Sequence, residues 1–380
     1  MSSAYANGIQ VEHSEIAPDL RLGADVRIRA RELQIGAGVS IEAGVVIEAE
    51  RVVLAAGSHI AHGVRIAADT FELGLRSRIE SECRLAAVGG AAQHIRFGDH
   101  CMFGASNIAL VPELLVGDYV KIHNHTLING LRPCYIGHNT WVGQNCVLNA
   151  NDVLFIGNNV GIGTYTSIWT HAFFGELLEG SQVFSVAPTI IEDSAWLVGA
   201  YNVVSPGLRI GKQAMVLTSS VVAKSIAPGH TVAGVPARDV TDRIPAVRQV
   251  PAAERLDMMR RFVREFVEQV HPGRHSELAD GHRVQPAHGP AFDVIVRERL
   301  RDQDVTSATI ITLAYALADE RSVASPNVSY FDLITKAYDK RSSEPEIQII
   351  SFMTTYRARF VPRGLERVGS MPVLPAEAAG

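Results

Sequence analysis

The sequence lacks several features that would assign it to particular protein classes. Its 380 residues contain 4 cysteines and no CxxC pair, so the spacings predict neither a zinc ribbon nor a disulfide framework. No apolar run approaches the length of a membrane span, and residues 1–10 contain no basic-then-apolar leader, so we expect a cytoplasmic protein. The net charge of −5 gives no support for binding to nucleic acid or anionic membranes.

What the sequence does contain is a period of six. Aliphatic residues return at every sixth position through most of the first 225 residues, as in Ile35, Ile41 and Ile47. This period is typical of a solenoid of hexapeptides, in which each sixth residue points into a narrow triangular core. We predict about nine coils of three hexads each, with a length of about 40 Å if each coil adds one strand spacing. The coils start at Ile35, Leu54, Leu73, Phe97, Val116, Ile136, Ile156, Ile191 and Ile210.

A second position supports this register. The residue two places before each aliphatic should also face inward and be small, and this holds in most hexads, although Tyr201 does not fit. The cysteines all occupy this small inward position, and we therefore predict buried thiols of low reactivity rather than metal ligands. They are Cys83, Cys101, Cys134 and Cys146.

The organisation changes near residue 245, which predicts more than one domain. An amphipathic helix is expected from Leu256, Met259, Val263, Phe266 and Val270, followed by a His-, Gly- and Pro-rich linker over 272–290. The predicted division is a lead-in over 1–30, a β-helix over 31–245 with a loop at 171–190, a helix and linker over 246–290, a small domain over 291–365 and a loose tail over 366–380.

The small domain is predicted to be α+β, with three strands followed by a helix. The strand-like runs are 292–296, 308–313 and 329–338, and the helical spacing of Ile347, Ile350, Met353 and Tyr356 lies within 345–360. Ser343 and Glu346 would form a capping box at the start of this helix. Because no catalytic constellation is present, we expect docking or acceptor selection here.

Two interruptions of the repeat are candidates for function. Coil starts are normally 19 or 20 residues apart, but the intervals from Leu73 to Phe97 and from Ile156 to Ile191 are 24 and 35 residues. A solenoid has regular faces, so function tends to lie where the regularity breaks. The longer interruption opens at Thr170 and His171 and is long enough to cover a pocket.

The region around the longer interruption resembles the hexapeptide-repeat acyltransferases of the maltose, galactoside and sugar O-acetyltransferase kind. The resemblance spans about residues 30–245 and is strongest over 136–240. It is carried by Thr170-His171, by 191–200, by 205–211, by 219–229 and by the closing run 233–238. The resemblance implies a left-handed β-helix, a homotrimer with active sites between neighbouring prisms, and acetyl-CoA as co-substrate, with no metal expected.

The resemblance also implies a catalytic histidine at the mouth of the inserted loop, a place that His171 takes here. The following Ala172 departs from the proline that the family often has, which leaves the loop path and the acceptor pocket open. A sugar hydroxyl is a poor nucleophile at neutral pH, and an imidazole base is typically worth about 10²- to 10⁴-fold in rate. We therefore predict acetylation of a sugar or glycan hydroxyl.

Other site residues follow from the register and the resemblance. Counting one coil back places Asn151 under His171, beside Asn149, and both are assigned to acceptor or oxyanion contacts unless they are solvated corner residues. Trp196 lines the acceptor groove or packs at a corner. The remaining candidates are Gly199 and Ala200 beside the pantetheine, and Ser219, Lys224 and Arg238 around the CoA adenosine and phosphates.

Three alternatives remain open at this stage. The acceptor could be the amine of a nucleotide-linked amino sugar rather than a hydroxyl. The chain could be a non-catalytic β-helix scaffold whose C-terminal domain recruits partners. His123, His125 and His138 on outward or corner positions leave a gamma-class carbonic anhydrase, with zinc between subunits, as the rival enzyme.

Overall fold

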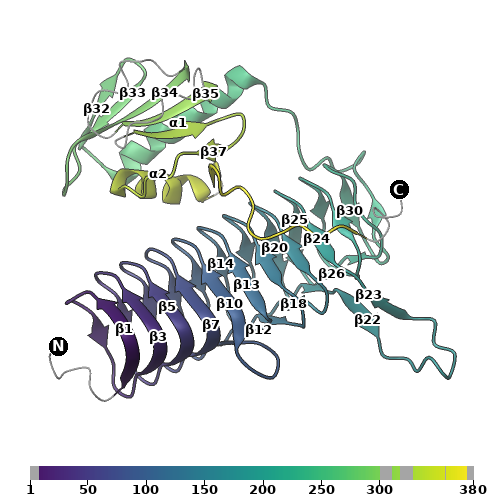
Figure 1. Ribbon diagram of the computed structural model, residues 1–380. Coiled ribbons are helices and arrows are strands. Elements are labelled where there is room, and N and C mark those ends of the chain that lie inside the picture. The colour runs from purple at the N-terminus through teal and green to yellow at the C-terminus, as the bar shows by residue number, and fades with distance from the viewer. Residues whose placement is uncertain (1–7, 300–309, 317–327, 356, 375–380) are drawn as a thin grey trace. The chain divides into compact units, whose positions relative to one another are not determined.

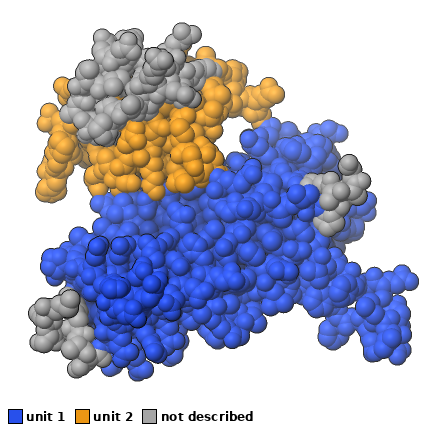
Figure 2. All heavy atoms as spheres, in the orientation of Figure 1, with its two compact units in different colours: residues 1–247, 367–380 blue, residues 248–366 orange. Residues whose placement is uncertain are grey.

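The computed structural model describes residues 8–299, 310–316, 328–355 and 357–374. The chain divides into two compact units, of which unit 1 comprises residues 1–247 and 367–380 and unit 2 comprises residues 248–366 (Figure 2). Among the described residues, neither helix is long and apolar enough to cross a membrane.

Unit 1 is a left-handed parallel β-helix (Figure 1). The hexads predict the solenoid, and the family resemblance implies its left-handed form. One face is a twelve-stranded sheet in which all strands but the last are parallel. Its strands are β2 (Arg21–Leu22), β4 (Ser40–Ile41), β6 (His59–Ile60), β8 (Arg78–Ile79), β11 (Met102–Phe103), β14 (Lys121–Ile122), β17 (Trp141–Val142), β20 (Gly161–Thr164), β25 (Trp196–Ala200), β28 (Met215–Val216), β30 (Thr231–Ala233) and β31 (Arg238–Asp239).

The other two faces belong to one seventeen-stranded sheet, because four long strands bend around the corner between them. The long strands are β1 (Ile9–Ile16), β3 (Arg27–Ile35), β5 (Val46–Leu54) and β7 (Arg65–Leu73). Beyond them, the second face has β9 (Arg84–Ala86), β12 (Ile108–Leu110), β15 (Leu127–Asn129), β18 (Val147–Asn149), β21 (Ser167–Ile168), β26 (Val203–Val204) and β29 (Val221–Val222). The third has β10 (Ala92–Phe97), β13 (Glu113–Val116), β16 (Cys134–Ile136), β19 (Leu154–Ile156), β24 (Thr189–Ile191) and β27 (Arg209–Ile210). We call the corner between these two faces the long-strand corner.

The β-helix begins earlier than the hexads predict. β1 pairs in parallel with β3 from Ile9–Ile28 to Ile16–Ile35, so residues 9–30 form coil rather than a lead-in, and the total exceeds nine coils. The aliphatic pattern is weaker at the open end of the solenoid, so it does not predict these early coils. There, Glu12 and Glu15 are exposed and Val11 is only half-buried.

The small inward residues are buried, and several tie one coil to the next. Their hydroxyl or thiol donates a hydrogen bond to a glycine carbonyl of the following coil, as from Ser77 to Gly98 at 2.6 Å and from Cys101 to Gly117 at 2.9 Å. Burial raises the pKa of Cys83 and Cys134 to about 12 and that of Cys146 to about 11. The thiols are therefore core groups, as predicted.

The misfit at Tyr201 marks a bulge. The pairing of β20 with β25 shifts between Ile162–Leu197 and Thr164–Ala200, which adds one residue to the coil. The inward position is consequently taken by Asn202, which is buried and bonds to Ser220 N at 3.1 Å and Val198 O at 3.0 Å. Tyr201 turns outward at the corner with a φ of 61°.

The described residues of unit 2 form a seven-stranded sheet and two helices. α1 (Ala252–Val270) buries Leu256, Met259, Val263 and Phe266 as predicted, but Val267 is buried in place of the exposed Val270. The sheet order is β32 (His275–Leu278), β33 (Gly281–Val284), β34 (Phe292–Arg299), β35 (Ile310–Ala316), β36 (Val328–Asp332), β37 (Ala337–Tyr338) and β38 (Val361–Pro362).

Several details of unit 2 differ from the prediction. The predicted run 329–338 is divided into β36 and β37, which pair antiparallel, and the sheet has more than the three strands expected. The expected linker at 272–290 contains the antiparallel hairpin β32–β33, whose polar composition gave no strand signal. α2 (Glu344–Thr354) starts at Ser343, whose hydroxyl accepts from Glu346 N at 3.4 Å, but Glu346 itself accepts from Ser342 N and Arg341 N rather than from Ser343. Tyr356 and residues 308–309 lie outside the described residues.

The predicted loose tail is a strap on unit 1. Met371 and Leu374 pack against Tyr135, Phe155 and Ile190, an outward-facing stripe that runs in register across β16, β19 and β24. Gly369 lies so close to the Tyr135 ring that a Cβ would come within 2.3 Å of it. We call residues 367–374 the strap. Their apolar residues follow no period, so the sequence gives no signal for this packing.

We expect Leu374→Ala to lower the free energy of unfolding of the β-helix by about 2 kcal/mol, because it removes a buried leucine side chain from the stripe. The matched control is Val373→Ala, since Val373 is exposed. Chemical denaturation of the full chain measures both. Equal stability of the two variants would show that the strap does not hold to the stripe.

Candidate active site

The longer interruption of the repeat forms a hairpin arm that stands out from the β-helix (Figure 1). β22 (His171–Phe173) pairs antiparallel with β23 (Phe184–Val186), and the Phe173 and Phe184 rings stack at 5.5 Å. We call residues 171–186 the arm. It leaves the β-helix from β21 at the long-strand corner and returns into β24, so His171 sits where the arm meets the rigid coil.

The His171 side chain is held by Asn149 of the preceding coil. Nδ1 of His171 lies 2.8 Å from Oδ1 of Asn149, which is itself buried on β18. The imidazole is flanked by the rings of Trp169 at 5.6 Å and Phe173 at 4.7 Å, measured between centroids. The imidazole is therefore held through its Nδ1 atom, and the His171 side chain is half-buried.

The surroundings of Asn149 determine which imidazole nitrogen carries hydrogen. Oδ1 of Asn149 receives the backbone N–H groups of Asn151 at 3.3 Å and Thr170 at 3.4 Å, while its Nδ2 donates to Asn129 O at 3.3 Å. Backbone N–H groups only donate, so Oδ1 is the carbonyl oxygen, and Nδ1 of neutral His171 must carry the hydrogen. The lone pair then lies on Nε2, the nitrogen a general base would use.

Thr170 is a site residue to which sequence reasoning gave no role. It is completely buried, its hydroxyl lies 2.8 Å from Oδ1 of Asn149, and its Oγ1 accepts from Asp152 N at 3.0 Å. The sequence signal for this role is a threonine directly before the histidine, two residues after the core residue Ile168. Through these two hydrogen bonds, Thr170 connects the Asn149 carboxamide to the backbone of the 149–152 turn.

Asn149 and Asn151 have different positions, although the sequence grouped them. The register pairs Leu148 with Ile168 and so places Asn151 level with His171, but the side chain that reaches the imidazole is that of Asn149. Side-chain direction, rather than level along the axis, decides the contact. Asn151 takes part through its backbone N–H.

The predicted cofactor residues gather elsewhere on the solenoid. Gly199, with a φ of 74°, and Ala200 form the bulge, and Thr218 bonds to both backbone groups of Ala200 at 3.2 and 3.0 Å. Ser219 N donates to Ala200 O at 2.9 Å, so Ser219 belongs to the same corner. Thr218 has no signal in the sequence, because its role depends on hydrogen bonds to the preceding coil. Lys224 and Arg238 are exposed on later coils.

Trp196 belongs to an exposed aromatic cluster. It lies on β25 of the twelve-stranded sheet, two strands from Trp141, with Gly161 between them. Tyr165 and Tyr201 stack at 5.0 Å at the adjacent corner. These four exposed rings, which we call the aromatic face, are on a different face of the prism from Asn149. Within one chain, the histidine and the predicted cofactor residues are therefore separate.

His123, His125 and His138 have separate local environments. His138 is buried and its Nδ1 accepts from Asp118 N at 2.8 Å, while the His123 ring packs on Trp141 at 5.1 Å and burial lowers the pKa of His123. His125 occupies a corner with a φ of 59°. Among the described residues, no three His, Cys, Asp or Glu side chains lie close enough together to hold a metal ion.

The tautomer of His171 is directly testable. We expect nitrogen NMR of the neutral ring to show hydrogen on Nδ1, because Asn149 offers an acceptor there. Asn149→Ala should restore the Nε2-protonated form that free histidine favours, whereas Asn151→Ala should leave the tautomer unchanged. A bare Nδ1 in the unaltered protein would contradict the arrangement.

Comparison with known proteins gives local sequence similarity to acetyltransferases. No family model matches the sequence. The chain is 31% identical over 114 residues to galactoside O-acetyltransferase of Escherichia coli, covering 29% of this chain and 55% of the relative. It is 39% identical over 69 residues to 2,3,4,5-tetrahydropyridine-2,6-dicarboxylate N-acetyltransferase of Staphylococcus aureus, covering 18% of this chain and 28% of the relative. The chain thus spans about half the length of the first of these relatives, and less of the second.

Among solved structures, a hexapeptide-repeat acetyltransferase of Vibrio cholerae complexed with acetyl-CoA aligns with 39% of this chain and 69% of its own, at 23% identity and a TM-score of 0.26. The sequence relatives are acetyltransferases, and the coils seen in the structure follow the hexad pattern. The β-helix of this chain is therefore similar to the hexapeptide-repeat acyltransferases, as its sequence predicts.

Proposed function

We propose that this protein transfers an acetyl group from acetyl-CoA to a hydroxyl of a sugar or glycan. The observation that carries the proposal is the fixed imidazole of His171, whose Nδ1 is bound to Asn149 and whose Nε2 is left as the basic nitrogen. The sequence similarity to a galactoside O-acetyltransferase supports the acyl donor and the acceptor class.

In the proposed reaction, His171 acts as general base. Nε2 takes the proton of the acceptor hydroxyl as the oxygen attacks the thioester carbonyl, and a tetrahedral oxyanion forms. When the carbon–sulfur bond breaks, the imidazolium returns the proton to the leaving thiolate, so the products are the acetyl ester and free CoA. Backbone N–H groups are suited to stabilise the oxyanion.

Asn149 is best assigned to positioning rather than to acceptor contact. Its carbonyl oxygen and its amide are both engaged within the protein, and its side chain is buried. The imidazolium that forms during the reaction is stabilised by the Asn149 carbonyl dipole at 2.8 Å. Asn151, which is only half-buried, remains the proposed acceptor or oxyanion residue.

We assign acetyl-CoA to the bulge and the aromatic face. In this proposal the pantetheine passes the backbone at Gly199, which has no side chain, with Ala200 and Ser219 at the same corner and Trp196 on the same strand, β25. Lys224 and Arg238 are the exposed cations proposed for the phosphates.

This arrangement requires more than one copy of the chain, and we propose a homotrimer. The arm exposes Phe174, Leu178 and Phe184, and a two-stranded hairpin is marginal in water on its own. Contact between the arm of one copy and the aromatic face of the next would bring His171 to the proposed acetyl-CoA site. A head-to-tail contact of this kind closes into a ring when the rotation permits.

A second candidate is acetylation of an amine. The similarity to a dicarboxylate N-acetyltransferase favours it, and a neutral amine could use the same base and donor. An acceptor screen with matched hydroxyl and amino sugars separates the two candidates.

We expect His171→Ala to lower the rate of acetyl transfer by about 10²- to 10⁴-fold, because the general base is lost. Release of free CoA thiol from acetyl-CoA, measured with a panel of glycans and amino sugars, is the readout. His62→Ala changes an exposed histidine in the turn between β6 and β7 and should leave the rate unchanged. Full activity of the folded His171→Ala protein would refute the assignment of the base.

We expect the double change Phe174→Ser and Leu178→Ser to dissociate the trimer, because both side chains are exposed on the arm. Sedimentation velocity over a range of concentrations measures the oligomeric state. Val88→Ser alters an exposed apolar residue in a different loop and should leave the assembly intact. A monomeric unaltered protein would contradict the proposal.

A further inference from the structure

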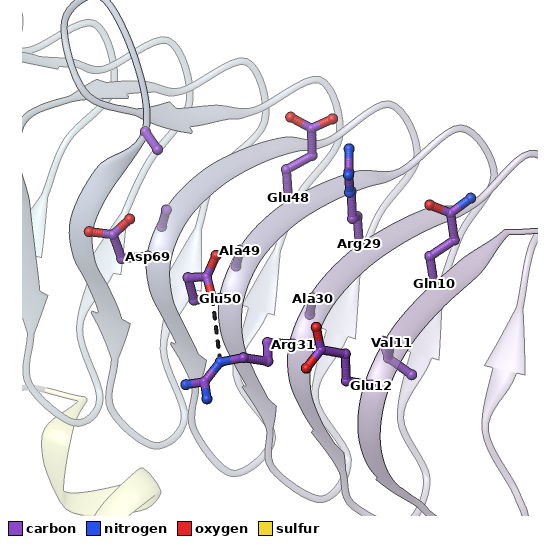
Figure 3. Close-up of a pocket in the computed structure, with 12 residues that line it drawn as sticks. Gln10, Val11, Glu12, Arg29, Ala30, Arg31, Glu48, Ala49, Glu50 and Asp69 are labelled. Carbon is purple, nitrogen blue, oxygen red and sulfur yellow. Dashed lines mark ion pairs between the residues drawn. The ribbon is translucent and has the colours of Figure 1, made fainter.

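A charged groove crosses the four long strands at the opposite end of the β-helix from the aromatic face. It has a volume of about 630 Å³ and runs between two rows of outward side chains (Figure 3). One row contains Gln10, Arg29 and Glu48, and the other contains Glu12, Arg31 and Glu50 with Asp69 beyond. Between the rows, the floor is formed by Val11, Ala30, Ala49 and Ala68, so it carries only small or medium apolar side chains.

The groove has an excess of acidic groups. Arg31 is paired with Glu50 at 3.5 Å and with Glu32 at 3.2 Å. Among the described residues, Glu12, Glu48 and Asp69 make no ion pair, and Arg29 is the single unpaired cation that lines the groove. The groups therefore offer hydrogen-bond acceptors and a net negative field to a ligand.

The shorter interruption of the repeat borders this groove. The 24-residue interval between Leu73 and Phe97 puts a small loop after β9, and Ala91 of that loop lines the end of the groove. Both interruptions of the repeat thus lie along the long-strand corner.

The row that contains Glu48 continues in register to Asn149, the residue that holds His171. Glu48 pairs with Ala67 on β7. Ile66 pairs with Leu85 on β9, so the next residue, Ala67, is level with Ala86. Ala86 then pairs with Leu110, Leu110 with Asn129, and Asn129 with Asn149. From Glu48 to Asn149 this is five strand spacings, or about 24 Å along one corner.

We propose that the groove binds the distal part of a linear glycan acceptor whose sugars are neutral or carry free amino groups. This inference rests on the proposed acyl transfer. One strand spacing is close to the length of one pyranose unit in an extended chain, so each coil can present its carboxylates or guanidinium to the hydroxyls of one sugar. The net negative field disfavours anionic glycans. A chain held here and extended along the corner presents a later unit to His171.

The test is binding of defined oligosaccharides to the whole protein without acetyl-CoA. Glucosamine oligomers of two to six units are titrated by calorimetry, with oligogalacturonate as the anionic comparison. We expect affinity to rise with length up to about four units, one for each long strand, and then to level off. The anionic oligomer should bind more weakly at every length.

The variant for this test is Glu12→Gln with Glu48→Gln, which keeps shape and removes charge. We expect it to weaken binding of the four-unit oligomer by about tenfold, in line with the loss of charge-assisted hydrogen bonds. Glu15→Gln is the control, because Glu15 is an exposed carboxylate of the same strand outside the groove. In the transfer assay, the double variant should raise KM for long acceptors and leave KM for a monosaccharide unchanged.

The outcomes separate this inference from the proposed function. Length-dependent binding that the double variant weakens supports the groove even if no CoA thiol is ever released, in which case only the proposed function fails. Thiol release without length-dependent binding overturns the groove alone. Equal effects of Glu15→Gln and the double variant also overturn it.

Discussion

The structure of unit 1 depends on the stacking of each coil on the one before it. Backbone hydrogen bonds and an aliphatic residue at each sixth position hold consecutive coils in register, so a residue has defined neighbours one coil above and below. Additional hydrogen bonds from small inward hydroxyls and thiols to glycine carbonyls reinforce this register. Because the register between most coils is constant, a side chain on one coil can be placed accurately against a side chain on the next. The contact between Asn149 and His171 is an instance of this placement.

Much of the β-helix could be predicted because one repeated physical requirement, the filling of a narrow core, is visible in the sequence. The hexads predicted the aliphatic core, the buried cysteines and the position of the arm. The hexads were less informative where a coil departs from its standard length. At the bulge before Asn202, the added residue is visible in the sequence only because Tyr201 does not fit the small inward position. The end coils were missed because fewer of their positions are buried.

The candidate site was only partly predictable. His171 could be singled out from its place at the interruption, and the register located the segment beneath it, but the choice between Asn149 and Asn151 depends on which way each side chain points. The role of Thr170 depends on hydrogen bonds among neighbours of different coils, for which a single sequence has no periodic signal. The strap and the hairpin β32–β33 were missed for a related reason, because their partners are distant or their strands are polar.

The strap changes how unit 2 is connected to the β-helix. Residues 248–366 leave unit 1 after its closing coil and the chain rejoins unit 1 at the strap, so unit 2 is an insertion with two attachment points rather than an appendage with one. Two attachments limit the volume that a domain can explore, and thereby raise its effective concentration near its own β-helix.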